Sequence, residues 1–171
     1  MACNQTLSGI ARDCDPSMGG IIEALIANKE DVTEITISTN QVTAITMASS
    51  KKFKKYEFPR NTGSLTSNYT IDLANGVRYV QSDLVLSFGR MDTSKRVEIT
   101  ALAQNDLVII VKDANGKYWL LGKDEGVNAS AADGVTGTAR ADRNGYSVTL
   151  QDNSLEMPYE VDPDIIDALV G

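Results

Sequence analysis

A change of hydrophobic period marks residues 93–122 as the best-defined part of the chain. Its first part has the spacing of one helix, which Thr93 or Ser94 can cap and which ends near Asn105 and Asp106. We therefore expect a single helix whose apolar side packs against the rest of the fold. The residues that cluster toward that side are Val97, Ile99, Ala101, Leu102 and Ala103.

A β-hairpin is predicted directly after this helix. Residues 107–111 are five consecutive apolar residues, mostly β-branched; they are too few for a helix and predict a strand covered on both faces. Residues 113–116, Asp-Ala-Asn-Gly, tolerate the positive φ angles of a tight turn. Residues 117–121 then return as a second strand, which contains the only tryptophan, Trp119. This hairpin is expected to form core, because nothing in it is reactive.

Two β segments are expected near the beginning of the chain. Residues 21–27 are an apolar run that is compatible with a strand or a short helix, and the preceding pair Gly19-Gly20 favours the strand. Residues 32–47 are rich in threonine and isoleucine on both sides of Ser38-Thr39-Asn40, which predicts a hairpin.

A basic segment, residues 51–58, follows this hairpin. Its partial alternation places Phe53 near one face and both Tyr56 and Phe58 on the other, before Pro59 ends it. Such a run can contact nucleic acid, but on a strand it more often protects an edge or meets an acidic neighbour. Attraction between subunits is a natural use for it in an acidic chain. The lysines concerned are Lys51, Lys52, Lys54 and Lys55.

A second hairpin, within residues 61–92, is unusually long. Residues 74–77, Ala-Asn-Gly-Val, form the turn between strands at 65–73 and 78–91. The second strand exceeds the usual five or six residues, and a strand this long tends to project beyond the core of one domain. Its length therefore indicates assembly, in which a partner subunit covers the part of the strand that its own subunit leaves exposed. One face of it carries Tyr79, Gln81, Asp83, Val85 and Ser87, and the other carries Arg78, Val80, Ser82, Leu84, Leu86 and Phe88.

The last third of the chain is predicted to contain a loop, a hairpin and a short helix. Residues 123–138 are rich in glycine, alanine, aspartate and serine, so we expect a surface loop of about fifteen residues. Residues 137–141 and 146–150 are expected to pair across a turn at 142–145. Residues 162–169 begin with an aspartate cap followed by proline, as many helices do.

The composition is that of an ordinary globular protein. A length of 171 residues fits one domain, which we place at residues 21–171 behind an extended arm at residues 1–20. The chain has neither a secretory signal nor an apolar run long enough to span a membrane, so synthesis in the cytosol is expected. Cys3 and Cys14 are then expected to be two reduced thiols, with a disulfide as the alternative.

The net charge of −7 disfavours a general nucleic-acid binder, because such binding depends on neutralising phosphates. An acidic surface is nevertheless suitable for a channel through which DNA passes without binding tightly.

The sequence contains no complete catalytic or metal-binding pattern. Acidic clusters that could hold magnesium or calcium through carboxylates alone are more typical of solvated loops and helix starts; they are Asp124-Glu125 and Glu160, Asp162, Asp164 and Asp167. The chain has no histidine, which excludes most hydrolase and zinc sites. Residues 113–116 and 142–145 begin like calcium loops, but their glycine stands at the fourth position and no glutamate follows at the twelfth, so they are turns. No phosphate-binding glycine loop occurs either. We therefore expect a protein that is not an enzyme and needs no metal or cofactor.

Two segments give the chain a resemblance to a known family. They are ALAQNDLVIIVKDANGKYWLLGKDEG at 101–126 and GTARADRNGYSVTL at 137–150, with weaker support from the GGI segment at Gly19. Together with the order of elements, they resemble the tail tube proteins of bacteriophages, particularly those of phages and prophages of Bacteroides-type bacteria. The motifs are packing and turn patterns, and the basic segment and the first twenty residues have no counterpart that we can match.

The resemblance implies a mainly β fold, a β-sandwich or barrel of antiparallel strands with one flanking helix. It also implies a virion structural protein whose copies form a homo-oligomeric ring in the tail tube, or in a tail barrel or connector of a short tail. Such a ring would contact neighbouring tail proteins and let DNA pass through its lumen. Besides the four lysines, Tyr79 and Val85 are then expected at the subunit interface, and Asp72 and Asp83 are expected to face the lumen.

A different class of function is also compatible with the sequence. Trp119, Tyr118 and Tyr146 could form a stacking platform for sugars in a carbohydrate- or receptor-binding β-sandwich. The burial of Trp119 separates the two hypotheses: exposure in a concave patch favours binding, and packing into the core disfavours it.

Overall fold

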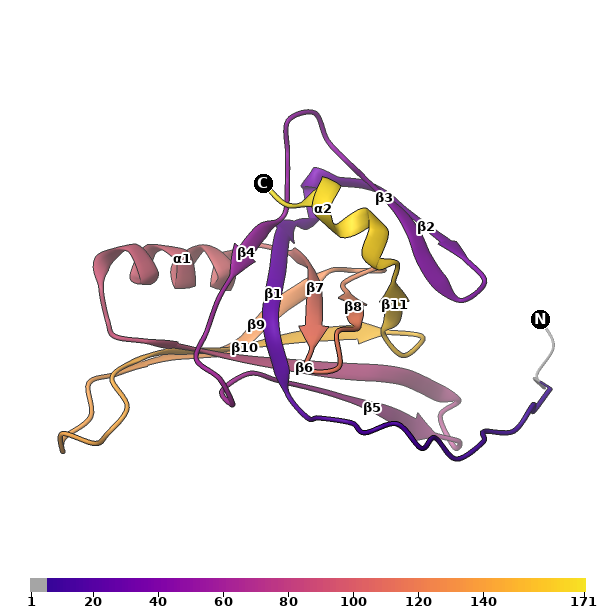
Figure 1. The fold of residues 1–171 in the computed structure, drawn as a ribbon, viewed down its shortest axis with the longest axis horizontal. Helices are drawn as coiled ribbons and strands as arrows, with labels where there is room; N and C mark the ends of the chain where they lie inside the picture. The colour runs from indigo at the N-terminus through magenta and orange to yellow at the C-terminus, as the bar shows by residue number, and fades with distance from the viewer. Residues whose placement is uncertain (1–5) are drawn as a thin grey trace.

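The computed structural model describes residues 6–171 and confirms a mainly β fold (Figure 1). Eleven strands and two helices are present in the described part of the chain. The strands are β1 (Ile21–Asn28), β2 (Val32–Ser38), β3 (Gln41–Met47), β4 (Lys54–Tyr56), β5 (Ser64–Asp72), β6 (Val77–Gly89), β7 (Leu107–Asp113), β8 (Tyr118–Leu121), β9 (Val127–Val135), β10 (Gly145–Ser154) and β11 (Tyr159–Val161); the helices are α1 (Thr93–Gln104) and α2 (Ile166–Leu169); and the 3₁₀ turns are η1 (Lys29–Asp31) and η2 (Pro163–Ile165).

Strand β7 lies between the two halves of the core. Leu107, Ile109 and Val111 point into one apolar cluster, which β6 and β10 also supply. Val108 and Ile110 point into a second cluster on the opposite side, which contains residues of β3, β8 and α2. All five side chains are buried, so the prediction of a strand covered on both faces is confirmed.

Two layers of strands enclose the first cluster. Strands β9, β10, β6 and β5 pair in this order as an antiparallel sheet, here called the long sheet, which runs across the lower part of the view in Figure 1. The remaining strands lie above it, and α1 lies over one end. The layers are joined in one hydrogen-bonded sheet, because β7 pairs with β9 at Leu107 and Val127. One pair departs from the antiparallel pattern, since β11 runs parallel to β3.

The hairpins predicted around residues 39 and 75 are confirmed. Thr39 and Asn40 have φ angles of 53° and 61° between β2 and β3, which is the geometry of a type I′ turn. Gly76 has a φ of 66° between β5 and β6. Strand β6 is 13 residues long, and its predicted apolar face is buried from Val80 to Leu86 while the alternate residues stay partly exposed.

The two ambiguous segments at the beginning of the chain are also resolved. Residues 21–27 are a strand, β1, which pairs with β7 along nearly its whole length. In the basic segment, Phe53 is buried in the second cluster, whereas Tyr56 and Phe58 pack against the first. The predicted division of these aromatic residues between two faces is therefore confirmed, although only Lys54–Tyr56 form a strand.

Helix α1 is present as predicted, but two details of the prediction are wrong. Its cap is Asp92, one residue earlier than expected, whose Oδ1 accepts a hydrogen bond from the Lys95 amide at 2.8 Å. Its apolar side is also narrower, because Leu102 is buried and Ile99 partly buried while Val97 remains 53% exposed. The helix covers only a small part of the sheet, so few of its positions need to be apolar.

The loop predicted at 123–138 is wrong, because residues 127–135 form β9. This strand is rich in alanine and aspartate, but it pairs with β10 from Val127 to Val135, with one register shift. Pairing with an established strand supplies the hydrogen bonds that a weak intrinsic preference would not secure. The strand predicted at 137–141 is also wrong, since residues 136–144 form the loop that joins β9 to β10. The predicted helix at 162–169 is present as η2 and α2, with Asp162 as its cap.

Residues 6–20 form no helix or strand and leave the body of the protein beside β5 (Figure 1). Their last residues are fixed to the β7–β8 turn: the Met18 amide donates to Asn115 Oδ1 at 2.8 Å, and the Ala114 amide donates to the Gly20 carbonyl at 3.0 Å. Residues 6–16 are exposed.

Candidate assembly surface

The outer face of the long sheet, which points away from the core, is mainly polar, although Val77 and Val85 of β6 and Ala131 and Val135 of β9 also belong to it. Strand registers place Thr66, Asp83 and Gln151 in one row across β5, β6 and β10. The neighbouring rows are formed by serine, threonine, asparagine and glutamine around Val85 and Tyr79. No lysine or arginine of these four strands belongs to this face, and its carboxylates are Asp72, Asp83 and Asp133. The face is therefore polar and mildly acidic.

The opposite face of the same sheet is apolar and packs into the first cluster, which fixes the position of the sheet. Val80, Leu84 and Leu86 of β6 are fully buried, together with Val148 and Leu150 of β10. Ser82 is buried among them, but its hydroxyl lies 2.7 Å from that of Ser67 on β5, so each satisfies the other.

The two outer strands of the long sheet have open edges. Strand β5 ends the order of strands, and β9 contacts β7 only at Val127, so residues 128–135 have no partner on that side in the described chain. Soluble proteins usually protect such edges with lysine, proline or bulges. Neither β5 nor β9 contains a lysine or proline, and β9 has one register shift against β10, whereas β2, another outer strand, carries Glu34 and two register shifts. Strands β5 and β9 are therefore the edges best suited to pair with another chain.

Two of the residues expected at the interface, Tyr79 and Val85, lie on this outer face. The four lysines lie elsewhere, beside β4, and each is bonded within its own chain. Lys51 is 3.5 Å from Asp31, and Lys52 donates to the Ala168 carbonyl. The remaining two contacts are Lys54 Nζ to the Gly171 carbonyl at 3.4 Å and Lys55 Nζ to Glu23 and Glu57 at 3.1 and 3.3 Å. The structure does not bring the lysines together with Tyr79 and Val85.

The two aspartates expected to face a lumen have different surroundings. Asp83 lies in the middle of the outer face, where the Gln81 amide nitrogen donates to its Oδ2 at 3.2 Å. Asp72 lies at the end of the hairpin and closes its turn, because its carboxylate accepts hydrogen bonds from Ala74 and from both nitrogens of Asn75. These hydrogen bonds, first of all that of the Asn75 side chain, lower the pKa of Asp72.

The three aromatic residues of the alternative hypothesis do not form one platform. Trp119 is half-buried against the first cluster, and its Nε1 donates to Asp113 Oδ2 at 3.0 Å. Tyr118, the preceding residue of the same strand, packs against the second cluster on the opposite side. Tyr146 lies on β10 opposite Phe88, on the inner face of the long sheet. Sugar stacking needs exposed rings on a common surface, which this arrangement does not offer.

A buried carboxylate was not anticipated from the sequence. Asp152, on the inner face of β10, is only 3% exposed, and its Oδ1 has no hydrogen-bond partner in the described chain. Burial raises its pKa; Asp124 and Glu125 raise it further, while the Gly122 amide and Lys29 oppose the shift. Lys29 is itself held by the carbonyls of Gly122 and Lys123 at 2.9 and 2.7 Å. Alternation along β10 could have marked Asp152 as inward-facing.

Comparisons with known proteins do not assign the chain to a family. No family model matches it, and neither a curated protein nor a solved structure shows detectable similarity. Residues 6–171 include no cluster of three or more carboxylate or cysteine side chains suited to a metal ion. Within the same residues, no helix is long and apolar enough to cross a membrane.

Proposed function

We propose that this protein is a structural subunit whose copies join edge to edge into a ring and line a channel for DNA in a bacteriophage tail. The observation that carries the proposal is the pair of open edges, β5 and β9, on opposite sides of one sheet. A surface that presents two different edges makes head-to-tail contacts, and such contacts close into rings when the rotation between subunits permits.

Strand directions are compatible with this junction. Strands alternate in direction from β9 through β10 and β6 to β5, so β5 of one copy and β9 of the next run in opposite directions when related by a rotation about the ring axis. The junction then continues the antiparallel pattern of the sheet. Closure into a barrel removes the open edges altogether, which is the most complete protection that a sheet can have.

The outer face of the long sheet would line the channel, because the second layer and α1 already cover its inner face. A lining of hydroxyl and amide groups with a few carboxylates repels phosphates weakly, and Arg143, which reaches this face from the β9–β10 loop, is paired with Asp133 at 3.0 Å. DNA would therefore pass without tight binding.

The assignment to a phage tail rests on the resemblance of residues 101–126 and 137–150 to tail tube proteins. In this proposal the protein is made in the host cytoplasm, is incorporated into the virion tail, and contacts neighbouring tail or connector proteins above and below its ring. Both a stacked tube and a single ring in a short tail use the same lateral junction.

The direct experiment is light scattering combined with negative-stain electron microscopy of the purified protein over a range of concentrations. Rings or tubes are expected, and a compact monomer at the highest concentrations would contradict the proposal. The variants Asn68→Pro and Tyr69→Pro locate the junction, because adjacent residues of a strand point their N–H groups to opposite sides. One variant removes a donor to β6; the other removes a donor at the open edge and should abolish assembly with little loss of stability.

A further inference from the structure

One end of the long sheet extends past the layer of strands that covers the rest of it. Alternation along β5 puts Tyr69 and Ile71 on the inner face, where Leu65 packs against the first cluster. Both residues are nevertheless exposed, and Leu73, which directly follows β5, is 91% exposed. The second layer therefore stops short of this end of the sheet in the described chain.

The β10–β11 loop brings further apolar side chains to the same end. The strand registers place Ser154 in one row with Tyr69 across β6, and the loop begins directly after Ser154. Leu155 and Met157 of the loop are exposed, while the Ser154 hydroxyl fixes the loop by donating to the Glu156 carbonyl at 2.8 Å. Exposed apolar groups that gather in one place usually mark a contact surface. This surface, here called the apolar end, consists of Tyr69, Ile71, Leu73, Leu155 and Met157.

The N-terminal arm carries apolar side chains that are themselves in water. Leu7 is 95% exposed and Ile10 fully exposed, and residues 6–16 are exposed throughout. The base of the arm is fixed, since Asn115 Nδ2 donates to the Met18 carbonyl at 3.1 Å. The arm is therefore an anchored segment whose apolar groups gain free energy from any apolar surface within reach.

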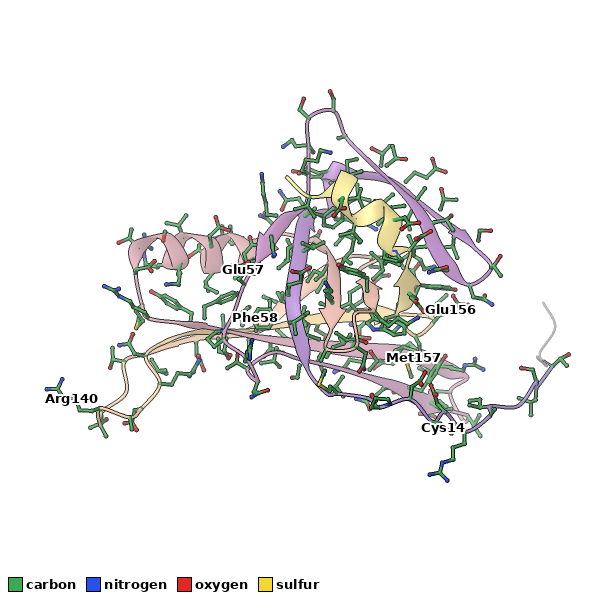
Figure 2. The ribbon with its side chains drawn as sticks, viewed as in Figure 1. Cys14, Glu57, Phe58, Arg140, Glu156 and Met157 are labelled. Carbon is green, nitrogen blue, oxygen red and sulfur yellow. The ribbon has the colours of Figure 1, made fainter. Side chains whose placement is uncertain are left out.

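The apolar end lies in the direction that the arm takes. Met18 and Leu65 line the same cleft, so the arm leaves the body at the start of β5. From there it runs toward the end of the β5–β6 hairpin (Figure 1). Figure 2 shows Cys14 of the arm toward the same end of the molecule as Met157, with Arg140 at the opposite end.

The length of the arm matches the distance to the apolar end. Eight residue steps separate Met18 from Ile10, and eight separate Leu65 from Leu73. Each interval spans about 26 Å of extended chain, so Ile10 can reach Leu73. Gly9 has a φ of 79°, and no atom lies within 4 Å of the position that a Cβ would take there. The chain can therefore turn at Gly9 and fold its first residues back over the end of the sheet.

We propose that the arm is a strap that folds over the apolar end of its own copy and packs Leu7 and Ile10 against it. The tether makes this contact intramolecular, at an effective concentration of about millimolar, so it forms in preference to contact with another free copy. The charges agree, because Arg78 lies 5.6 Å over the Tyr69 ring and the arm carries Asp13. The strap does not depend on the ring and shields the free subunit from apolar contacts through this end.

Photocrosslinking tests where the arm lies. A benzophenone is attached through Ser8→Cys in a background of Cys3→Ser with Cys14→Ser, and labelled ordinary copies are mixed with unlabelled ¹⁵N copies before irradiation. Mass spectrometry should find insertion into the peptides that carry Leu73 or Met157, and only in ordinary copies. Insertion mainly into ¹⁵N copies, insertion elsewhere or no insertion would overturn the proposal. The same label combined with Leu7→Ser and Ile10→Ser is the control, and undiminished insertion there would also contradict packing by these side chains.

Dye binding tests whether the strap covers the apolar end. The double variant Leu7→Ser with Ile10→Ser removes two apolar side chains, yet it should raise the fluorescence of anilinonaphthalene sulfonate at least about twofold, because the apolar end becomes uncovered. Adding Leu73→Ser should reverse most of this rise. Val97→Ser, the same kind of change at an exposed position of α1, is the matched control and should cause no rise.

The sign of the dye result decides the question. If Leu7 and Ile10 stay in water, their removal leaves the fluorescence unchanged or lowers it, and either outcome refutes the strap. The measurement is made on the free subunit, at concentrations where light scattering detects no assembly. A chain that never forms rings therefore refutes the proposed function and leaves this test intact, and a refuted strap leaves the ring intact.

Discussion

Removing the charge of Asp152 should stabilise the protein, which makes Asp152→Asn the sharpest test of how the long sheet is packed. The carboxylate lies on the inner face of β10 and is almost completely buried, and its Oδ1 has no hydrogen-bond partner in the described chain. The contact with the Gly122 amide can be kept, because an asparagine oxygen accepts the same hydrogen bond. The substitution therefore removes a buried charge while preserving the shape of the side chain and its one hydrogen bond.

The size of the effect follows from the cost of burying a charge that is poorly paired. The substitution removes only the cost of the charge, because asparagine places an NH₂ group where Oδ1 has no partner, and one unit of pKa shift corresponds to about 1.4 kcal/mol. Lys29 offsets part of this cost, although its ammonium donates to the carbonyls of Gly122 and Lys123 rather than to Asp152. We expect Asp152→Asn to gain about 1–2 kcal/mol at pH 7, or a melting temperature about 2–8 °C higher.

The gain should depend on pH in a defined direction. Burial raises the pKa of Asp152 in the folded state above its usual value of 3.8, so the folded protein binds this proton more tightly than the unfolded chain does. The contribution of Asp152 to the free energy of unfolding is therefore most favourable when the pH is below 3.8, and this contribution is lost as the pH rises through the raised pKa of the folded state. The asparagine side chain of the variant does not titrate, so the advantage of the variant should be smallest below about pH 4, grow as the pH rises, and then become constant.

Urea denaturation at a series of pH values measures this difference. Asp167→Asn is the matched control, since Asp167 is exposed and the same chemical change should have little effect there. If Asp152→Asn proves less stable than the wild type at neutral pH, or if its advantage does not change with pH, the assignment of an unfavourable buried charge is refuted.

Three further predictions concern the core, a turn and the proposed channel. Phe53→Ala should lower the free energy of unfolding by about 3–5 kcal/mol in urea titrations, because the side chain is fully buried; a loss below about 1 kcal/mol would contradict its place in the core. Gly122→Ala should lower the melting temperature more than Gly116→Ala. The two glycines have nearly equal φ angles, 84° at Gly122 and 85° at Gly116, but only at Gly122 would a Cβ lie 2.6 Å from the Leu107 carbonyl oxygen. Equal losses in the two variants would show that the structure around Gly122 relaxes to remove this contact. In assembled rings, Gln81→Lys combined with Asp83→Lys should retain DNA in a salt-dependent manner, whereas lysines introduced outside the channel should not; equal retention by both would argue against the proposed lining.

The candidate assembly surface was only partly predictable from the sequence. The alternation along β6 is enough to assign Asp83 and Val85 to the polar side, because side chains of a strand alternate with period two. The open edge of β9 was not predictable, since residues 128–134, between Val127 and Val135, lack the β-branched and aromatic residues that indicate a strand. The basic segment was recognised as a unit, but its distance from the outer face depends on the pairing of β4 with β1.

Local chemistry by itself determined three hairpins, around residues 39, 75 and 115, together with helix α1 and the buried strand β7. Glycine and asparagine fix turns at Asn40, Gly76 and Gly116 through backbone angles that other residues adopt at a cost, and five consecutive apolar residues fix β7 as interior. The tertiary structure decided which of those elements pair and pack with one another. Strand β9 exists because β10 offers it hydrogen bonds, and the edges of β5 and β9 remain open because no other part of residues 6–171 pairs with them. Such pairing joins residues far apart in the chain, which local preference does not specify.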